Sequence, residues 1–340
     1  MGSARWLSAG DLFDLAGNPE EAERAVTEGA SPLTLVHLDA AGLALLDGRS
    51  PPSLPWRVVV GVMEGRPMAP PPVALDMALC TGDAPPGWVT APAPDDALAL
   101  IGAAAGANPH ASAVLCQLLR VNEQLSLAGG LTAESFAYSM LLAGAEFAAW
   151  NGTRRVPAYR PSPEPVMVSE DGATVTISLN RPEVRNAYDA ATRDALVDVL
   201  RGLAALPDPP PVVLAGNGPA FCSGGDLSQF GTTPDPVTAH AARTARSPGL
   251  LLHRLGATAR VHGACVGAGI ELPAFCRRVV AAADSTFRLP EVGMGLVPGA
   301  GGTASILARI GRHRTACLAV TGQAVTAPVA LEWGLIDEVE

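Results

Sequence analysis

The sequence contains no lysine. All 23 basic residues among its 340 are arginines. Schiff-base chemistry on a lysine amine is therefore excluded, and any phosphate group of a ligand must be met by arginine or by backbone N–H groups. The 33 acidic residues outnumber the basic ones and leave a formal net charge of −10. This charge opposes binding to nucleic acid, so we expect no nucleic-acid partner.

Long apolar runs and paired cysteines are also missing. The first residues reach Asp11 and Asp14 without a long apolar stretch, so we expect no signal peptide, no membrane segment and a cytoplasmic protein. The six cysteines form no C-x-x-C pair and no metal-like grouping with the six histidines. We therefore expect reduced, mostly buried thiols and no metal site. Hydrophobic residues make up 48% of the chain, which is ample for a buried core.

A proline-rich segment, residues 155–165, divides the chain near its middle. Clustered prolines suit an extended connector better than packed secondary structure. We therefore predict a boundary there, between a first region over residues 1–154 and a second over residues 166–340.

The first region carries more signals for helices than for chemistry. Residues 33–38 and 56–62 have the composition of strands. From 95 to 150 apolar residues recur at helical spacing, with interruptions at 108–109 and 129–130. We predict three or four helices in that stretch.

The second region alternates strands and helices, which indicates an α/β fold with parallel strand pairing. Asp189 is a suitable N-cap for the helix that follows it. A third glycine-rich run at 298–302 precedes a further helix. The predicted strands are 166–169, 174–179, 211–215, 259–262 and 279–282, and the predicted helices are 190–203, 238–254 and 271–277.

Two glycine-rich stretches, 221–226 and 263–271, follow predicted strands. A glycine N–H can approach a substrate carbonyl without a side chain intervening, and two such donors can share the charge of an enolate or a tetrahedral oxyanion. Gly225 and Ala268 are the candidate donors. Taken singly, each stretch also fits a tight strand-to-helix turn. The spacing lacks the G-x-G-x-x-G pattern, which argues against a dinucleotide site.

Two glutamates, Glu271 and Glu291, accompany these loops. Adding water across a double bond conjugated to a thioester needs a base to activate water at Cβ and an acid to deliver a proton to Cα. We assign Glu271 mainly to the water and Glu291 to the Cα proton. Either residue alone also fits a helix N-terminal charge or a surface carboxylate.

Four motifs together resemble the crotonase, or enoyl-CoA hydratase/isomerase, superfamily over about residues 165–340: 181–187 (RPEVRNA), 219–227 (PAFCSGGDL), 262–272 (HGACVGAGIEL) and 289–303 (LPEVGMGLVPGAGGT). The resemblance implies a spiral of ββα units preceded by a mixed, largely helical N-terminal region. It also implies homotrimers or hexamers and acyl-CoA substrates, with coenzyme A as part of the substrate and no separate cofactor.

On this sequence the resemblance places the two thioester-oxygen donors at Gly225 and Ala268 and the catalytic carboxyl groups at Glu271 and Glu291. Hydratases of the family use two glutamates, whereas many isomerases and hydrolases keep one or neither, so the pair favours a hydratase. The implied substrate-binding positions are Arg185, Ala187, Ser223, Gly224, Asp226, Leu227, Gly267, Pro290 and Gly299.

Two features depart from the family pattern. Ser228 and Gln229 stand where many hydratases have a lysine for the CoA phosphates, so we consider Arg185, Arg243 and Arg246 for that role. The chain also stops before the usual C-terminal helices.

Residues 95–154 resemble those missing C-terminal helices. We therefore hypothesise that residues 1–154 are a degenerate crotonase-like unit whose helices cap the active site of the same or a neighbouring chain. An unrelated helical domain is the alternative.

The leading interpretation is hydration of an enoyl-CoA, or the reverse dehydration, in fatty-acid or secondary metabolism. An enoyl-CoA isomerase is the nearest rival, since one glutamate can move a proton between Cα and Cγ. Thioester hydrolysis and cofactor-free oxygenation also occur in the superfamily, and fold alone does not choose among them. A non-catalytic acyl-CoA-binding scaffold is a further alternative.

Overall fold

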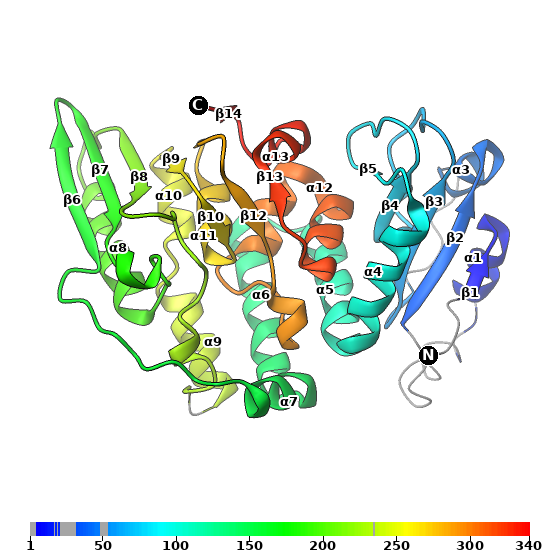
Figure 1. Ribbon diagram of the computed structural model, residues 1–340, viewed down its shortest axis with the longest axis horizontal. Helices are drawn as coiled ribbons and strands as arrows, with labels where there is room; N and C mark the ends of the chain where they lie inside the picture. The colour runs from blue at the N-terminus through cyan, green and yellow to red at the C-terminus, as the bar shows by residue number, and fades with distance from the viewer. Residues whose placement is uncertain (1–4, 17, 19, 21–31, 48–53, 234) are drawn as a thin grey trace.

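The computed structural model describes residues 5–16, 18, 20, 32–47, 54–233 and 235–340. Two sheets stand at opposite ends of the molecule, and helices fill the space between them (Figure 1). The end formed by the first region carries five strands, and the end formed by the second region carries six. A separate three-stranded sheet lies in the second region.

All neighbouring strands of the five-stranded sheet are parallel and follow chain order. The near-continuous apolar sequences of its second and third strands suit a sheet covered on both faces. On one face Val36 and Val59 pack in a core with α1 and α3, and on the other Leu35 and Val60 pack in a core with α4 and α5. The strands and the first two helices are β1 (Arg5–Leu7), α1 (Ala9–Ala16), β2 (Leu33–Leu38), α3 (Ala40–Asp47), β3 (Val58–Met63), β4 (Met77–Cys80) and β5 (Val89–Thr90).

Four helices follow: α4 (Pro94–Ala107), α5 (Pro109–Asn122), α6 (Leu127–Leu142) and α7 (Ala145–Thr153). The predicted interruption at 108–109 is confirmed. The one predicted at 129–130 is wrong, because those glycines lie in the first turn of α6. That helix begins after Ser126, whose Oγ accepts the Gly129 N–H at 3.2 Å.

None of the helices in the described ranges is by itself long and apolar enough to cross a membrane. Only as a pair, joined at a 106° bend, do α4 and α5 pass that test of length and composition.

The six-stranded sheet has the order β14-β11-β9-β8-β7-β6, with parallel pairs throughout except the β6–β7 hairpin. The predicted parallel α/β arrangement is thus confirmed. Asp189 caps α8 as predicted, since its Oδ1 accepts the Thr192 N–H at 2.7 Å. The elements are β6 (Val166–Asp171), β7 (Thr174–Leu179), α8 (Ala190–Ala204), β8 (Val212–Gly216), β9 (Thr258–Val261), β11 (Arg278–Ala281) and β14 (Glu338–Val339).

The remaining elements of the second region form a small sheet, short turns and further helices. The small sheet pairs β10 with β12 in parallel and β12 with β13 antiparallel. Three short 3₁₀ turns stand beside the loops: η1 (Pro182–Val184), η2 (Leu227–Gln229) and η4 (Glu291–Met294). The other bounds are β10 (Ala264–Val266), β12 (Thr286–Arg288), β13 (Val325–Thr326), α12 (Gly302–Thr321) and α13 (Ala327–Trp333).

Two predicted helices are divided in the structure. The 238–254 prediction becomes α9 (Pro236–Ala245) and α10 (Gly249–Arg254), with Pro248 at the start of the second. The 271–277 prediction is wrong over its length: α11 (Ala268–Glu271) ends there and a 3₁₀ turn, η3 (Pro273–Phe275), follows. Pro273 has no N–H to continue the α-helical ladder.

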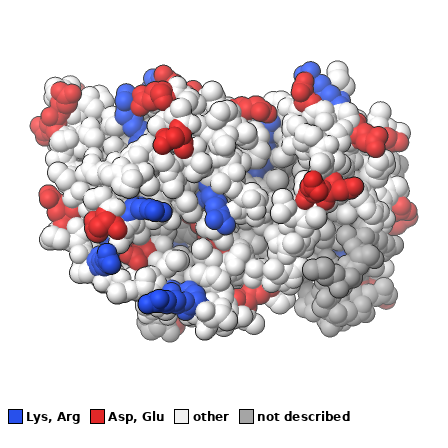
Figure 2. Space-filling view, viewed as in Figure 1, with Lys and Arg blue, Asp and Glu red and all other residues white. Residues whose placement is uncertain are grey.

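The two halves of the chain share one hydrophobic core that runs from the inner face of the first sheet to the second. Helix α12, which is kinked at Gly311, packs against α4, α5 and α6. Its arginines reach into the first half: Arg312 donates to the Leu75 and Val73 carbonyls at 2.7 and 3.0 Å, and Arg314 donates to the Trp88 carbonyl at 2.9 Å. Charged side chains are sparse and of mixed sign on the face shown in Figure 2.

Candidate active site

Glu271 stands at the end of α11, directly after the second glycine-rich loop. Its side chain is buried, with only 2% of the residue exposed. One carboxylate oxygen, Oε2, accepts the N–H groups of Ala300 and Gly302, each at 2.8 Å. Both donors lie in the glycine-rich segment 299–303 at the start of α12, where the helix dipole also favours negative charge. These two N–H groups therefore favour the ionised form of Glu271 and oppose the effect of its burial.

Glu291 opens the turn η4 and is 8% exposed. Its Oε2 is buried and has no hydrogen-bond partner. A Cβ atom placed on Gly267 would lie 2.5 Å from Oε1 of Glu291 and 3.8 Å from Oε1 of Glu271. The two predicted carboxyl groups thus approach one backbone position, and glycine leaves the space that they occupy.

Burial raises the pKa of both carboxyl groups, but to different extents. It raises the pKa of Glu271 to about 7, although the N–H groups of Gly302 and Ala300 and the charge of Arg243 oppose the rise. Burial, followed by the charge of Glu271, raises the pKa of Glu291 well above its ordinary value. Because the two groups titrate together, the proton favours Glu291, which has no donor at Oε2.

The two predicted donor loops lie side by side. Cys222 and Cys265 form an isolated parallel bridge between them. The Cys222 N–H donates to the Ala264 carbonyl at 3.3 Å, and the Val266 N–H donates to the Cys222 carbonyl at 3.0 Å. Within the described residues, neither the Gly225 nor the Ala268 N–H donates a hydrogen bond. Both N–H groups are therefore available to a ligand.

Backbone geometry explains why glycines stand in these loops. Gly224 has φ +97° and its carbonyl accepts the Tyr188 N–H at 2.8 Å. Gly267, at φ +50°, immediately precedes the Ala268 donor. Both conformations are left-handed, where L side chains are strained.

The 181–187 motif holds the first donor loop, residues 221–226, in place through hydrogen bonds and ion pairs. The Ser223 N–H donates to the Arg185 carbonyl at 2.9 Å. The buried Arg181 pairs with Asp226 at 2.9 Å and with Asp189 at 3.1 Å. Burial opposes ionisation of Asp226, but hydrogen bonds from Ser228 and the contact with Arg181 outweigh it and lower the pKa of that carboxyl. The Asp226 side chain is thus engaged in holding the loop beside Gly225.

The other predicted binding positions, Ala187, Pro290, Leu227 and Gly299, make different contacts within the fold. The Ala187 carbonyl accepts from the Arg181 guanidinium, and the Pro290 carbonyl accepts the Gly293 N–H at 3.1 Å. Leu227 is exposed at the start of η2. Gly299 lies under the ring of Tyr138, where a Cβ would come within 2.5 Å of two ring carbons.

The candidate phosphate-binding arginines differ in their surroundings. Arg246 pairs with Asp194 at 3.0 Å and with Asp198. Arg185 is exposed. Arg243 instead lies over the Tyr138 ring, 3.6 Å from its centroid, and its charge reaches Glu271. Arg243 therefore faces the carboxyl groups.

A third buried glutamate was not predicted. Glu134 of α6 is 2% exposed. Its Oε1 accepts the Gly301 N–H at 2.7 Å, and its Oε2 accepts the Thr303 N–H and Oγ–H at 2.9 and 2.7 Å. Burial, followed by the charge of Glu271, raises the pKa of Glu134 to about 8. The available sequence signal was an acidic residue within a largely apolar helix.

Helix α6 thus lies against the segment that holds Glu271, within one chain. Glu134 and Tyr138 both contact the 299–303 segment. Helix α9 packs on the same helix, where His240 Nδ1 lies 2.9 Å from Ser135 Oγ. These are contacts that a cap over the two glutamates requires.

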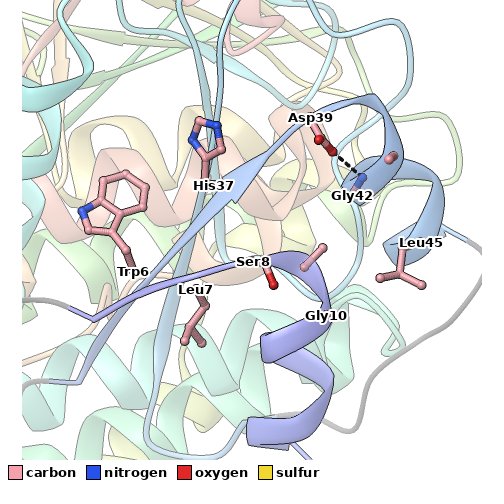
Figure 3. A pocket seen from close by; sticks show the side chains of 10 residues that line it. Trp6, Leu7, Ser8, Gly10, His37, Asp39, Gly42 and Leu45 are labelled. Carbon is pink, nitrogen blue, oxygen red and sulfur yellow. Dashed lines mark hydrogen bonds between the residues drawn. The ribbon is translucent and has the colours of Figure 1, made fainter.

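In the described parts of the chain, no group of three or more His, Cys, Asp or Glu side chains is arranged to hold a metal ion. A hollow of about 470 Å³ lies at the ends of β1 and β2, far along the chain from the glutamates (Figure 3). Its Asp39 accepts the Gly42 N–H at 2.6 Å and its Ser8 bonds Asp11, so these polar groups already serve as helix caps.

Comparisons with known proteins agree on the second half of the chain. The family model described as enoyl-CoA hydratase/isomerase matches residues 169–340. A 2,3-dehydroadipyl-CoA hydratase of Escherichia coli is 32% identical over 174 residues, which are 51% of this chain and 68% of that protein. A mevalonyl-coenzyme A hydratase of Aspergillus fumigatus is 33% identical over 168 residues, covering 48% and 61%. The enoyl-CoA hydratase structure from Bacillus anthracis shares 29% identity with a TM-score of 0.49, covering 52% of this chain and 70% of that one.

Proposed function

The chain belongs to the enoyl-CoA hydratase/isomerase family, and we propose that it adds water to an α,β-unsaturated acyl-CoA thioester or catalyses the reverse dehydration. Membership confirms the resemblance and the fold class expected from the four motifs. The proposal rests on one observation: two buried glutamates converge beside Gly267, next to two N–H groups that have no partner in the described structure.

The Gly225 and Ala268 N–H groups receive the thioester oxygen. When water attacks Cβ, the C=C electron pair moves toward the thioester and places negative charge on that oxygen. Two fixed N–H donors in a buried site stabilise this enolate more than the neutral thioester, which lowers the barrier. No cofactor is needed beyond the coenzyme A that the substrate carries.

The two glutamates divide the proton transfers. Glu271, held by two N–H groups, takes a proton from the attacking water as the O–Cβ bond forms. Glu291, whose Oε2 has no donor and whose pKa is raised well above its ordinary value, gives its proton to Cα. The sum of these steps consumes one water and leaves the pair with one proton between them, as at the start.

The experiment that tests the proposal is turnover of a panel of enoyl-CoA esters, followed by loss of the conjugated-enone absorbance. Chromatography with mass detection then identifies the product. A gain of one water supports the hydratase. A shifted double bond indicates the isomerase, free CoA thiol a hydrolase, and oxygen uptake an oxygenase. Tight binding without any turnover indicates a scaffold.

The panel includes one acyl chain that ends in a carboxylate. The Arg243 guanidinium stacks on the Tyr138 ring, and its charge acts on the Glu271 carboxyl group. A cation at this place is compatible with an anionic acyl group, and the Escherichia coli relative is named for an adipyl-type substrate. Comparing dehydroadipyl-CoA with crotonyl-CoA therefore tests the preference directly.

The proposed assembly is a homotrimer or hexamer. Exposed apolar side chains on adjacent helices, Phe136 and Met140 on α6 and Val237 on α9, supply surface for such contacts. Light scattering at micromolar concentration measures the mass, and a monomer across that range contradicts this part of the proposal.

A further inference from the structure

Glu134 and Glu271 share one backbone segment in an alternating pattern. The N–H groups of Ala300 and Gly302 point to Glu271, and those of Gly301 and Thr303 point to Glu134. The two carboxylates thus take four consecutive N–H groups. Glu134 comes from the first half of the chain and Glu271 from the second.

This arrangement makes the position of Glu271 depend on Glu134. The Gly301 conformation, with φ +109°, turns successive N–H groups to different sides. Each peptide unit is rigid, so holding the N–H groups of Gly301 and Thr303 restrains the Gly302 N–H that lies between them. The Ala300 N–H lies one residue before this stretch and is restrained from one side.

Hydrogen-bond donors surround the Glu134 carboxyl group and oppose the effect of its burial. Asn122 of α5 donates to the Thr303 Oγ at 3.1 Å, so the hydroxyl hydrogen is free to point at Glu134. Three donors therefore converge on one buried carboxylate. The other titratable or charged groups around it are Glu271 on α11, Glu291 on η4, and Tyr138 and Arg243, which stack between α6 and α9.

We propose that Glu134 is a positioning residue of the active site: it orients the segment whose N–H groups hold the Glu271 carboxylate, and so sets the hydrogen bonds that this base receives. The residue does not touch the reacting atoms. Its consequence is that the first half of the chain completes the catalytic machinery of the second. This inference rests on the proposed acid and base roles of Glu271 and Glu291.

The test is Glu134→Gln, compared with the matched control Glu146→Gln. Both glutamates accept two backbone N–H groups near a helix start, because Glu146 binds the N–H groups of His110 and Ala111 at 2.7 and 3.0 Å. Gln at 134 keeps the shape, removes the charge and presents an amide N–H₂ to one of the N–H donors. The control loses the same kind of contact away from Glu271.

The expected readout is the pH profile of kcat/KM. Gln at 134 turns an N–H₂ group toward the segment and loosens the Ala300 and Gly302 N–H groups from Glu271. Because those N–H groups lower the pKa of Glu271, the limb of the profile that reports this base moves to higher pH, by on the order of one unit. We expect kcat to fall by about tenfold while KM stays within about twofold, because substrate binding is untouched. Glu146→Gln keeps the profile in place. A Glu134→Gln profile that does not move overturns the proposal.

Two further measurements keep the test decisive. Thr303→Val removes one donor to Glu134, so the pH profile is expected to shift even if Glu134→Gln does not fold; an unmoved profile contradicts the proposal. If the native protein turns over no enoyl-CoA, the proposed function fails, but carboxyl carbon NMR still reports on Glu134. The Glu271 signal, assigned with Glu271→Gln, titrates at higher pH in Glu134→Gln if the proposal holds, and at an unchanged pH if it does not.

Discussion

Gly267 leaves the space that the Glu291 carboxylate fills: a Cβ on Gly267 would lie 2.5 Å from Glu291 Oε1. The same backbone position carries φ +50° and leads directly into the Ala268 donor. The site therefore depends on glycine twice here, once for the turn and once for the approach of the acid. Because Gly267 has no side chain, the Glu291 carboxyl group lies directly against the backbone of the glycine-rich loop.

Gly267→Ala is expected to lower turnover strongly while the fold survives. The added methyl displaces the Glu291 carboxylate and strains the left-handed turn, at a cost on the order of 1–3 kcal/mol in stability. Gly293→Ala is the matched control in η4, because nothing lies within 4 Å of its Cβ position. Thermal melting and initial rates of both variants check this. Equal activities would contradict the packing of Glu291 against Gly267.

Arg243→Met is expected to move the acid limb of the pH–rate profile to higher pH. The Arg243 charge lowers the pKa of Glu271, so its removal raises that pKa and the base must be deprotonated at a higher pH. Rates lost near neutral pH should return in more alkaline buffer. Arg246→Met serves as control, since that arginine pairs with Asp194 and Asp198 at the surface. An unmoved limb in Arg243→Met would show that its charge does not reach Glu271.

The carboxyl cluster makes the fold less stable as pH rises above the ordinary glutamate pKa. Burial raises the pKa of Glu134 from 4.5 to about 8 and that of Glu271 to about 7. Between those limits the folded chain holds more protons than the unfolded chain, so the free energy of unfolding decreases with pH. The slope is about 1.4 kcal/mol per pH unit for each extra proton.

Urea titrations from pH 5 to 8 measure this slope. The stabilisation is fully present below pH 4.5, decreases as pH rises, and is lost once pH has passed about 7 to 8. Glu134→Gln should flatten the dependence, because one of the titrating groups is gone. Native and variant proteins with the same slope would argue against a raised pKa for Glu134.

The sequence predicted the features that depend on local residues. The Asp189 cap and the strands over 166–169 and 174–179 follow from cap chemistry and alternation. Ending a helix near Pro273 also follows from local chemistry, yet the apolar run after Glu271 suggested a longer helix. The glycines at 129–130 suggested a break between helices, but α6 begins after the Ser126 cap and includes them.

The sequence could not predict the contact between Glu134 and the Gly301–Thr303 segment. These residues are separated by 167 and 169 positions, and only the packing of α6 on α12 brings them together. A glutamate in an apolar helix has many possible partners. The contribution of Glu134 to the site therefore depends on tertiary packing and could not be predicted from local sequence.

The most direct test of the central claim is single-turnover hydration of an enoyl-CoA ester by Glu271→Gln and Glu291→Gln, with CoA-ester affinity measured alongside. Each substitution keeps the shape of the side chain but removes a base or an acid that acts in the transition state. We expect the rate to fall by about 10²–10⁴-fold in each variant while affinity changes little. A near-native rate in either variant would contradict the role assigned to that glutamate.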